Sequence, residues 1–174
     1  YKGLQPGRKI NFKNDDYEAL RRVPGVERVS GRFYMWEEFT VNYRDKSGSF
    51  DVRSVHPDHQ YLEKSIMVSG RYINDRDIEE RRKVAAIGIE VAKFLFGKAS
   101  PLGEYITVRG IQYKVVGVFE DEGGEGELQK IFLPITTAQL AYNAHDRIDH
   151  LIFTVNVSSY AQSKEIEGRV RQML

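Results

Sequence analysis

The sequence predicts an α+β fold with mixed, mainly antiparallel sheets and a small α/β subdomain inserted into a discontinuous one. Short segments of alternating apolar and polar residues are separated by turn residues, which is typical of antiparallel strands. Segments with apolar residues at helical spacing occur near both ends and in the middle. The pattern of elements changes in the middle and returns near the end. We therefore expect residues 1–70 and 146–174 to form one subdomain, with residues 71–145 inserted as the second.

The first predicted helix begins at Asn14, whose side chain can cap it. Tyr17 and Leu20 form its apolar stripe, and residues 24–25 (Pro-Gly) end it. Next, β-branched and aromatic residues predict a long strand from Val29 to Tyr43.

A hairpin turn over residues 45–48 then leads into a return strand through Phe50, Val52 and Val55, which ends at residues 56–58 (His-Pro-Asp). The outgoing strand contains a run of aromatic residues at strand spacing. Aromatic residues in such a pattern usually belong to the core, so core packing is favoured over a ligand-binding platform. The run comprises Phe33, Tyr34, Trp36 and Phe39.

The middle of the chain predicts short elements. Asn74 and Asp77 resemble a capping arrangement for a helix over residues 75–82. A buried strand over residues 84–87 and a helix over residues 89–96 follow.

A hairpin comes next, with its turn at residues 109–110 and with Gly117 as a bulge in the returning strand. Residues 131–135 predict another strand, and Thr136 or Thr137 is expected to cap a short helix that ends at Tyr142.

The last stretch predicts a strand over residues 151–157 and a closing helix. Ser158 or Ser159 caps this helix, with Gln162 placed for a capping box. Its apolar stripe consists of Ile166, Val170 and Leu174.

The charge of the chain argues against a nucleic-acid partner. Its 26 lysines and arginines nearly cancel its 25 aspartates and glutamates, which leaves a formal net charge of +1. Proteins that bind duplex DNA usually gather a basic excess on one face. The tightest basic cluster, residues 81–83 with Arg76 nearby, is interrupted by acidic residues and is expected to be a solvated helix face.

The chain contains no cysteine, which excludes disulfides, thiol catalysis and thiolate metal sites. Its longest mostly apolar stretch, residues 84–96, contains Glu90 and Lys93 and is shorter than the roughly 20 residues a bilayer span requires. The first residue is Tyr1, and Leu174 lies within an amphipathic pattern, so we expect a piece of a longer protein. Proteolysis or a trimmed tag would give the same ends.

No catalytic, cofactor-binding or metal-binding residue is predicted, and we expect no enzyme activity. The phosphate-binding loop of nucleotide hydrolases and the Gly-x-Ser-x-Gly elbow of serine hydrolases are both missing from the sequence. A metal site at His56, Asp58 and His59 is conceivable, but a surface turn is favoured. The acidic loop over residues 121–127 could hold calcium, but a solvated connection is favoured there, and chelators should leave the melting temperature unchanged.

Several motifs resemble those of MacB-type permeases of the FtsX-like superfamily. Gly70-Arg71 followed by hydrophobic residues and Asp77 is similar to the start of that family's pattern. The other matching segments keep the family's order and spacing over roughly residues 14 to 157, and the sequence departs from the pattern in the acidic loop and in the aromatic strand before Asp45. The matching segments are residues 20–26, 84–88, 91–92, 95–97, 101–103, Ile106, 113–119 and 131–137.

The resemblance implies the periplasmic core domain of an ABC transporter permease in a bacterial inner membrane, with a porter-like base and an inserted α/β subdomain. In this family the domain transmits ATP-driven conformational change across the membrane, for efflux or extraction of a substrate. The implied partners are its own transmembrane helices, a second permease copy, an ATP-binding domain or subunit, and a periplasmic membrane-fusion protein or other periplasmic partner. We expect the terminal segments, residues 1–13 and 170–174, to connect to the membrane helices. No cofactor is implied.

Two alternatives remain open. An independent periplasmic ligand-binding module would show a concave, partly apolar pocket and a thermal shift with a small molecule. A hydrolase whose site residues are scattered along the sequence would show turnover that a single polar substitution abolishes.

Overall fold

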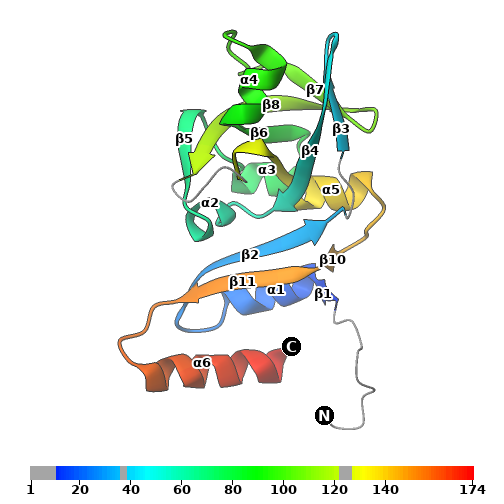
Figure 1. The fold of residues 1–174 in the computed structure, drawn as a ribbon. Coiled ribbons are helices and arrows are strands. Elements are labelled where there is room, and N and C mark those ends of the chain that lie inside the picture. The colour runs from blue at the N-terminus through cyan, green and yellow to red at the C-terminus, as the bar shows by residue number, and fades with distance from the viewer. Residues whose placement is uncertain (1–10, 36–38, 122–126) are drawn as a thin grey trace.

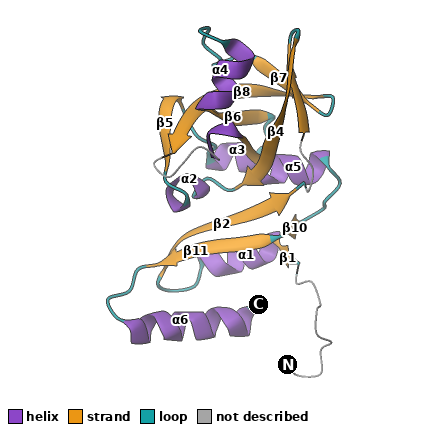
Figure 2. Cartoon of the chain, in the orientation of Figure 1, coloured by secondary structure: helices purple, strands orange, loops and turns teal. Residues whose placement is uncertain are grey.

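The chain folds into two stacked lobes, shown in Figure 1 and, by secondary structure, in Figure 2. The computed structural model describes residues 11–35, 39–121 and 127–174. We call the lower lobe, which holds the first and last described elements, the base. Its elements are β1 (Phe12–Lys13), α1 (Asn14–Arg21), β2 (Val26–Tyr34), β10 (Arg147–Ile148), β11 (His150–Val155) and α6 (Tyr160–Met173).

The remaining elements form what we call the upper lobe. They are β3 (Phe39–Tyr43), β4 (Lys46–Val55), α2 (His59–Leu62), β5 (Ser65–Gly70), α3 (Asp75–Glu79), β6 (Val84–Gly88), α4 (Ile89–Phe96), β7 (Tyr105–Val108), β8 (Ile111–Asp121), a 3-10 turn (Glu127–Gln129), β9 (Lys130–Pro134) and α5 (Ile135–Ala141).

The strands of the upper lobe close into a barrel-like circuit. β4 pairs with β3, β3 with β7, β7 with β8, β8 with β6, β6 with β9, and β9 returns to β4. Only β4–β9 and β6–β8 are parallel among the strand pairs of the described ranges, which confirms the predicted mainly antiparallel α+β fold. Closure leaves few free strand edges, and inward-facing aliphatic residues fill the interior.

One strand joins the two lobes. The first half of β4 pairs with β3, whereas its last residues, Arg53 to Val55, lie between β9 and β2. β2 in turn pairs with β11 along the base. β4 is therefore part of both lobes.

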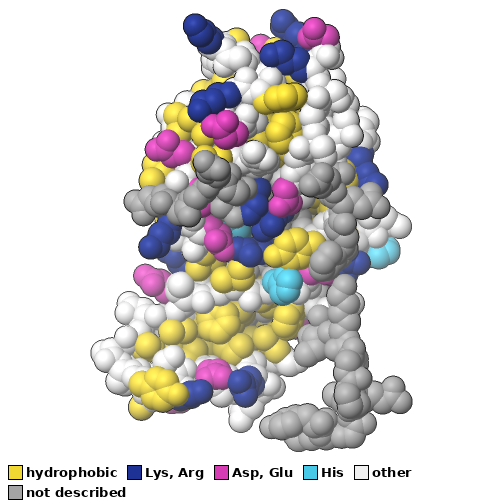
Figure 3. Space-filling model, viewed as in Figure 1, with side chains coloured by type: hydrophobic (Ala, Val, Ile, Leu, Met, Phe, Trp, Pro, Cys, Tyr) yellow, Lys and Arg dark blue, Asp and Glu magenta, His cyan; other side chains and the backbone are white. Residues whose placement is uncertain are grey.

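Each lobe has its own apolar core. The core of the upper lobe includes Phe39, Val52, Ile87, Tyr113 and Ile131. In the base, residues of α1, β2 and α6 pack with residues of α5, which belongs to the upper lobe by sequence; they include Leu20, Phe33, Ile135, Ala138 and Ile166. Figure 3 shows hydrophobic side chains gathered over the base next to α6. The apolar face of α5 therefore helps to join the lobes.

Several predicted elements are confirmed. Helix α3 has the predicted capping box of Asn74 and Asp77, α4 covers the predicted residues, and the β7–β8 hairpin turns at residues 109–110. A register shift opposite Gly117 confirms the bulge in β8. Ser159 caps α6 by accepting a hydrogen bond from the Gln162 N–H.

Other predicted boundaries are wrong. The strand expected from Val29 to Tyr43 is two strands, β2 and β3, which pair with different parts of β4 and have β11 and β7 as their other neighbours. The following turn lies at residues 44–45 rather than 45–48, since Tyr43 pairs directly with Lys46. Asn14 is the first residue of α1 instead of its cap, and Lys13 occupies the capping position. Leu174 remains exposed, so it does not extend the buried stripe of α6.

The predicted division at residues 70 and 146 remains a prediction. Strands on the two sides of residue 70 are hydrogen-bonded to each other, since β3 pairs with β7 and β5 pairs with β8. Within the described ranges, no helix combines the length and apolar character needed to cross a bilayer. Trp36 and residues 122–126 of the acidic loop lie outside the described residues.

Candidate functional site: the polar links around helices α3 and α5

The glycine pair Gly70 and Gly117 brings β5 unusually close to β8. The two glycines are register partners, and the Gly70 φ is +68°. A β-carbon on Gly70 would lie 2.2 Å from the Val116 carbonyl oxygen, and one on Gly117 would lie 2.0 Å from the Arg71 carbonyl oxygen. Only glycine permits such an approach, and it fixes the direction in which Arg71 leaves the strand.

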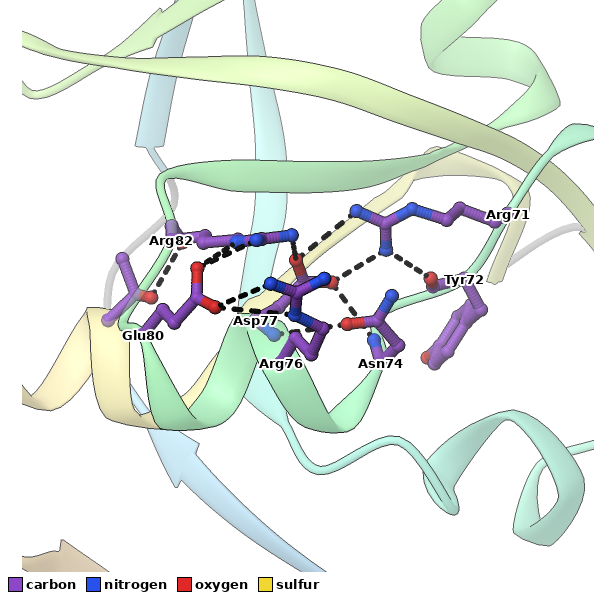
Figure 4. Close-up of polar contacts among 8 residues, drawn as sticks. Arg71, Tyr72, Asn74, Arg76, Asp77, Glu80 and Arg82 are labelled. Atoms are coloured by element: carbon purple, nitrogen blue, oxygen red, sulfur yellow. Dashed lines mark hydrogen bonds and ion pairs between the residues drawn. The ribbon is translucent and has the colours of Figure 1, made fainter.

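Asp77 is the centre of the network in Figure 4. Its side chain is fully buried and accepts hydrogen bonds from both terminal nitrogens of Arg71, at 2.7 and 3.2 Å. It also accepts a hydrogen bond from the Asn74 N–H at 2.9 Å. The Arg82 guanidinium also forms an ion pair with the Asp77 carboxylate, with 3.8 Å between the nitrogen and the oxygen. A buried carboxylate is tolerated because it is paired and hydrogen-bonded in this way.

The outer part of this network is exposed to solvent. Glu80 accepts from Arg82 at 2.7 Å and from Arg76 at 3.3 Å. These contacts, chiefly the hydrogen bond from Arg82, lower the pKa of the Glu80 carboxyl. Acidic partners thus engage two members of the basic cluster of residues 81–83 and Arg76, as expected for a solvated helix face.

Two threonines tie α3 to α5. The Thr136 hydroxyl donates to the Ile78 carbonyl oxygen at 2.6 Å, and the Thr137 hydroxyl donates to the Arg82 carbonyl oxygen at 2.7 Å. The prediction that one of them caps the helix is wrong, because Pro134 holds the capping position. The two hydroxyls instead satisfy one carbonyl group in α3 and one in the segment that follows it.

Gln139 ties α5 to the base. This side chain is 2% exposed, and its amide nitrogen donates to the Asn14 Oδ1 atom and to the Arg147 carbonyl oxygen, both at 2.9 Å. The Asn14 amide nitrogen donates back to the Gln139 Oε1 atom at 3.1 Å. A continuous set of contacts therefore runs from Arg71 through α3 and α5 to the start of α1.

The side chains of the His-Pro-Asp-His segment are engaged in contacts within the chain. The His56 Nδ1 atom accepts a hydrogen bond from the Gly31 N–H at 2.9 Å, and the His56 ring stacks on Tyr17 at 3.5 Å. Asp58 accepts from the Val29 N–H at 3.1 Å. The expected surface turn is wrong, because His56 and His59 are both buried.

Burial lowers the pKa of His56 and of His59 to about 3. Nearby arginines act in the same direction. Both rings are therefore neutral at ordinary pH and belong to the packing between the lobes. In the part of the chain that the structure describes, no group of three potential ligand side chains could hold a metal ion.

A family model described as the MacB-like periplasmic core domain matches residues 2–173. This chain belongs to that family. A MacB-like domain is the periplasmic part of an ABC transporter permease, as the sequence motifs predict, and not a catalytic domain. The Gly70-Arg71 and Asp77 motif thus has a structural explanation in the close strand approach and in the buried ion pair.

Related proteins agree with this assignment. The MacB-like domain is 25% identical over 98% of its length to "Macrolide export ATP-binding/permease protein MacB" of Bdellovibrio bacteriovorus. It is 31% identical over 76% of its length to the protein of the same name from Chlorobaculum tepidum. It spans 26% and 21% of the lengths of these two relatives.

Solved structures confirm the fold of the MacB-like domain. The periplasmic region of MacB from Actinobacillus actinomycetemcomitans superposes with a TM-score of 0.82 at 16% identity, covering 97% of this chain and 77% of the other. The extracellular domain of the transporter YknZ from Gram-positive bacteria gives 0.80 at 21% identity, covering 94% and 82%. At these identities the likeness concerns the fold alone.

Sequence reasoning missed the residues that tie α5 to α3 and to the base. Thr136, Thr137 and Gln139 lie in a short helix, where polar residues usually face solvent. Their partners are up to 125 positions away in the chain, as for Asn14 and Gln139. The one local signal was the glycine before Arg71, because a glycine can mark a backbone conformation or a close approach of strands that other residues do not permit.

Proposed function

We propose that this domain transmits ATP-driven conformational change across the membrane, so that the complete transporter can expel or extract a substrate. The observation that carries the proposal is a set of hydrogen bonds that α5 makes to two other elements. Thr136 and Thr137 donate to the carbonyl oxygens of Ile78 and Arg82, and Gln139 donates to Asn14 at the start of α1. Such links make the upper lobe follow any displacement of the base, because rigid elements move as bodies.

The placement of the elements supports this proposal. β1 and α6, the first and last described elements, both lie in the base, away from the circuit of strands in the upper lobe (Figure 1). A displacement applied to the base would reach the upper lobe through β4 and α5. In the proposed assembly the base connects to transmembrane helices, and a second permease copy, an ATP-binding domain or subunit and a periplasmic membrane-fusion protein complete the transporter.

Distance measurements in the complete transporter test the proposal. The 174 residues of this chain contain no cysteine, so once any cysteines elsewhere in the transporter are replaced, spin labels can be placed on cysteines introduced at Lys98 in the upper lobe and at Arg171 in α6. We expect the distance between these labels to stay constant in ATP-bound and nucleotide-free states. The distance from Lys98 to spin-labelled lipid head groups should change between the same states.

Each outcome bears on a different part of the proposal. A Lys98-to-lipid distance that is equal in all nucleotide states would reject transmission of motion. A Lys98–Arg171 distance that changes with nucleotide would reject the stiff connection between the lobes. In a Thr136→Val, Thr137→Val, Gln139→Leu variant the distribution of distances between the labels at Lys98 and Arg171 should broaden. The control Leu140→Ala, at an exposed position, should leave this distribution unchanged.

A further inference from the structure

A shallow groove in the upper lobe has features that the proposed function does not use. It has a volume of about 690 Å³ and lies beside the β7–β8 hairpin, where the chain leaves α3 and enters β6. This volume is within the range of ligand-binding clefts. The lining residues are Arg82, Lys83, Val84, Tyr105, Gly110, Ile111, Gln112 and Lys114.

The charged side chains that line the groove are all basic. Arg82, Lys83 and Lys114 line it, and none of its described lining residues is an aspartate or glutamate. The Arg82 guanidinium is directed at Glu80 and Asp77 (Figure 4), so its charge is already balanced. Lys83 and Lys114 are exposed, and within the described ranges neither side chain has an ion-pair partner. These two ammonium groups are available to an anion.

The backbones of the two lysines lie side by side at the start of β6. Lys114 pairs with Val84 in the β6–β8 ladder, and the Lys114 N–H donates to the Lys83 carbonyl oxygen at 2.9 Å. Both side chains line the same groove, so the anionic head of one ligand can lie between them. Because the backbone bond does not involve either side chain, both lysines can be replaced without removing it.

The backbone of β8 adds a polar edge. In an antiparallel pair, alternate residues direct their N–H and C=O groups away from the partner strand. The Lys114 N–H points away from β7 and donates to the Lys83 carbonyl oxygen. Gln112 is two residues earlier in the strand, so its backbone N–H and C=O groups point to the same side. β6 begins only at Val84, opposite Lys114, and its ladder does not extend to Gln112.

The remaining lining is apolar or aromatic. Tyr105 is 52% exposed and is the register partner of Lys114, and Ile111 is half-buried at the start of β8. An aromatic ring and an aliphatic side chain beside free ammonium groups suit a ligand that joins an anionic head to an apolar body.

We propose that this groove binds a small amphipathic anion, in which a carboxylate or a phosphate monoester is attached to an aromatic or apolar body. The anionic head contacts Lys83 and Lys114, and the apolar body packs on Tyr105 and Ile111. This inference concerns ligand binding only and does not depend on the transmission of motion.

Titration of the 174-residue chain, followed by the NMR shifts of its backbone amides, tests the inference. The probes are phenyl phosphate, 3-phenylpropionate, the neutral 3-phenylpropanamide and inorganic phosphate. We expect saturable shifts at Lys83, Gln112 and Lys114 with at least one aryl anion, and weaker binding of the other two probes. The tighter of the two aryl anions identifies the head group.

Substitutions make the test specific. Lys83→Ala with Lys114→Ala should weaken binding of the aryl anion roughly tenfold, because two exposed charge contacts are lost. Tyr105→Ser should weaken the aryl anions but not inorganic phosphate. Lys98→Ala removes an exposed lysine elsewhere in the upper lobe and should have no effect.

Four results would overturn the proposal: no saturable shift with either aryl anion, equal affinity for the neutral amide, equal affinity for inorganic phosphate, or full affinity in the double lysine variant. The amide spectrum of each variant shows at the same time whether it is folded.

Discussion

Asn14 and Gln139 pair through their side-chain amides although 125 positions separate them in the chain. Each amide donates to the oxygen of the other, at 3.1 and 2.9 Å. Asn14 begins the first helix of the base, and Gln139 lies in the helix that follows the last strand of the upper lobe. This reciprocal pair is therefore a direct polar connection between the two lobes.

The Asn14–Gln139 pair should show measurable coupling in a double-mutant cycle. We expect Asn14→Ala and Gln139→Ala to interact by about 1 kcal/mol in the free energy of unfolding, the usual net value of a hydrogen bond. Urea denaturation of the single and double variants measures this. The same cycle with Leu140→Ala, at an exposed neighbouring position, should be additive; coupling of equal size there would refute the assignment.

The buried carboxylate of Asp77 should be important for stability. Asp77→Ala removes the partner of Arg71 and the acceptor of the Asn74 N–H, so we expect a loss of about 2–3 kcal/mol. Asp77→Asn keeps the shape but not the charge and should lose less. Glu79→Ala, at the exposed end of the same helix, should change stability by less than about 0.5 kcal/mol. Equal effects at Asp77 and Glu79 in chemical denaturation would contradict the network.

The stability of the domain should fall in mild acid because of His56 and His59. Their pKa is about 3 in the folded chain, whereas an unfolded histidine has a pKa near 6.5. The unfolded state therefore binds more protons below about pH 6.5, and stability decreases as the pH falls. Between pH 7.5 and pH 5 each histidine should account for a loss of about 2 kcal/mol.

Urea denaturation at a series of pH values between 7.5 and 5 measures this loss of stability. Most carboxylates remain ionised in that range. His56→Asn, whose side chain offers an acceptor to the Gly31 N–H, should remove about half of the pH dependence. An unchanged slope in that variant would show that the dependence comes from other groups.

Core packing of the upper lobe gives a prediction that follows from the sequence itself. Phe119 and Ile131 are fully buried, so replacement of either by alanine should cost roughly 2–5 kcal/mol. Thermal or chemical denaturation measures the loss, with the exposed Tyr160→Ala as a control. A cost below about 0.5 kcal/mol at Phe119 or Ile131 would be inconsistent with their burial.

Local patterns predicted the elements that depend on local interactions. The capping box of Asn74 and Asp77, the turn at residues 109–110 and the bulge at Gly117 are each determined by a few neighbouring residues. Alternation correctly marked β8 and β11, apart from one or two residues at the ends.

The errors concern contacts between distant segments. The predicted strand from Val29 to Tyr43 is rich in strand-forming residues, but its two parts pair with different parts of β4 and with β11 and β7 on their other sides, which the sequence does not encode locally. β5, with the sequence Ser-Ile-Met-Val-Ser-Gly, was missed although it alternates weakly. Local sequence predicts a capping role for Thr136 or Thr137, whereas their hydroxyls donate to Ile78 in another helix and to Arg82 in the loop after it, which are distant in the chain.

The position of β4 also affects how the chain denatures. Since Arg53, Ser54 and Val55 are hydrogen-bonded to β2 on one side and to β9 on the other, neither lobe can lose its sheet without breaking the ladder of its neighbour. Heating should therefore melt the whole molecule in a single cooperative step, with equal calorimetric and van't Hoff enthalpies. A protease that recognises open segments would then find no half-unfolded form in which one lobe survives alone.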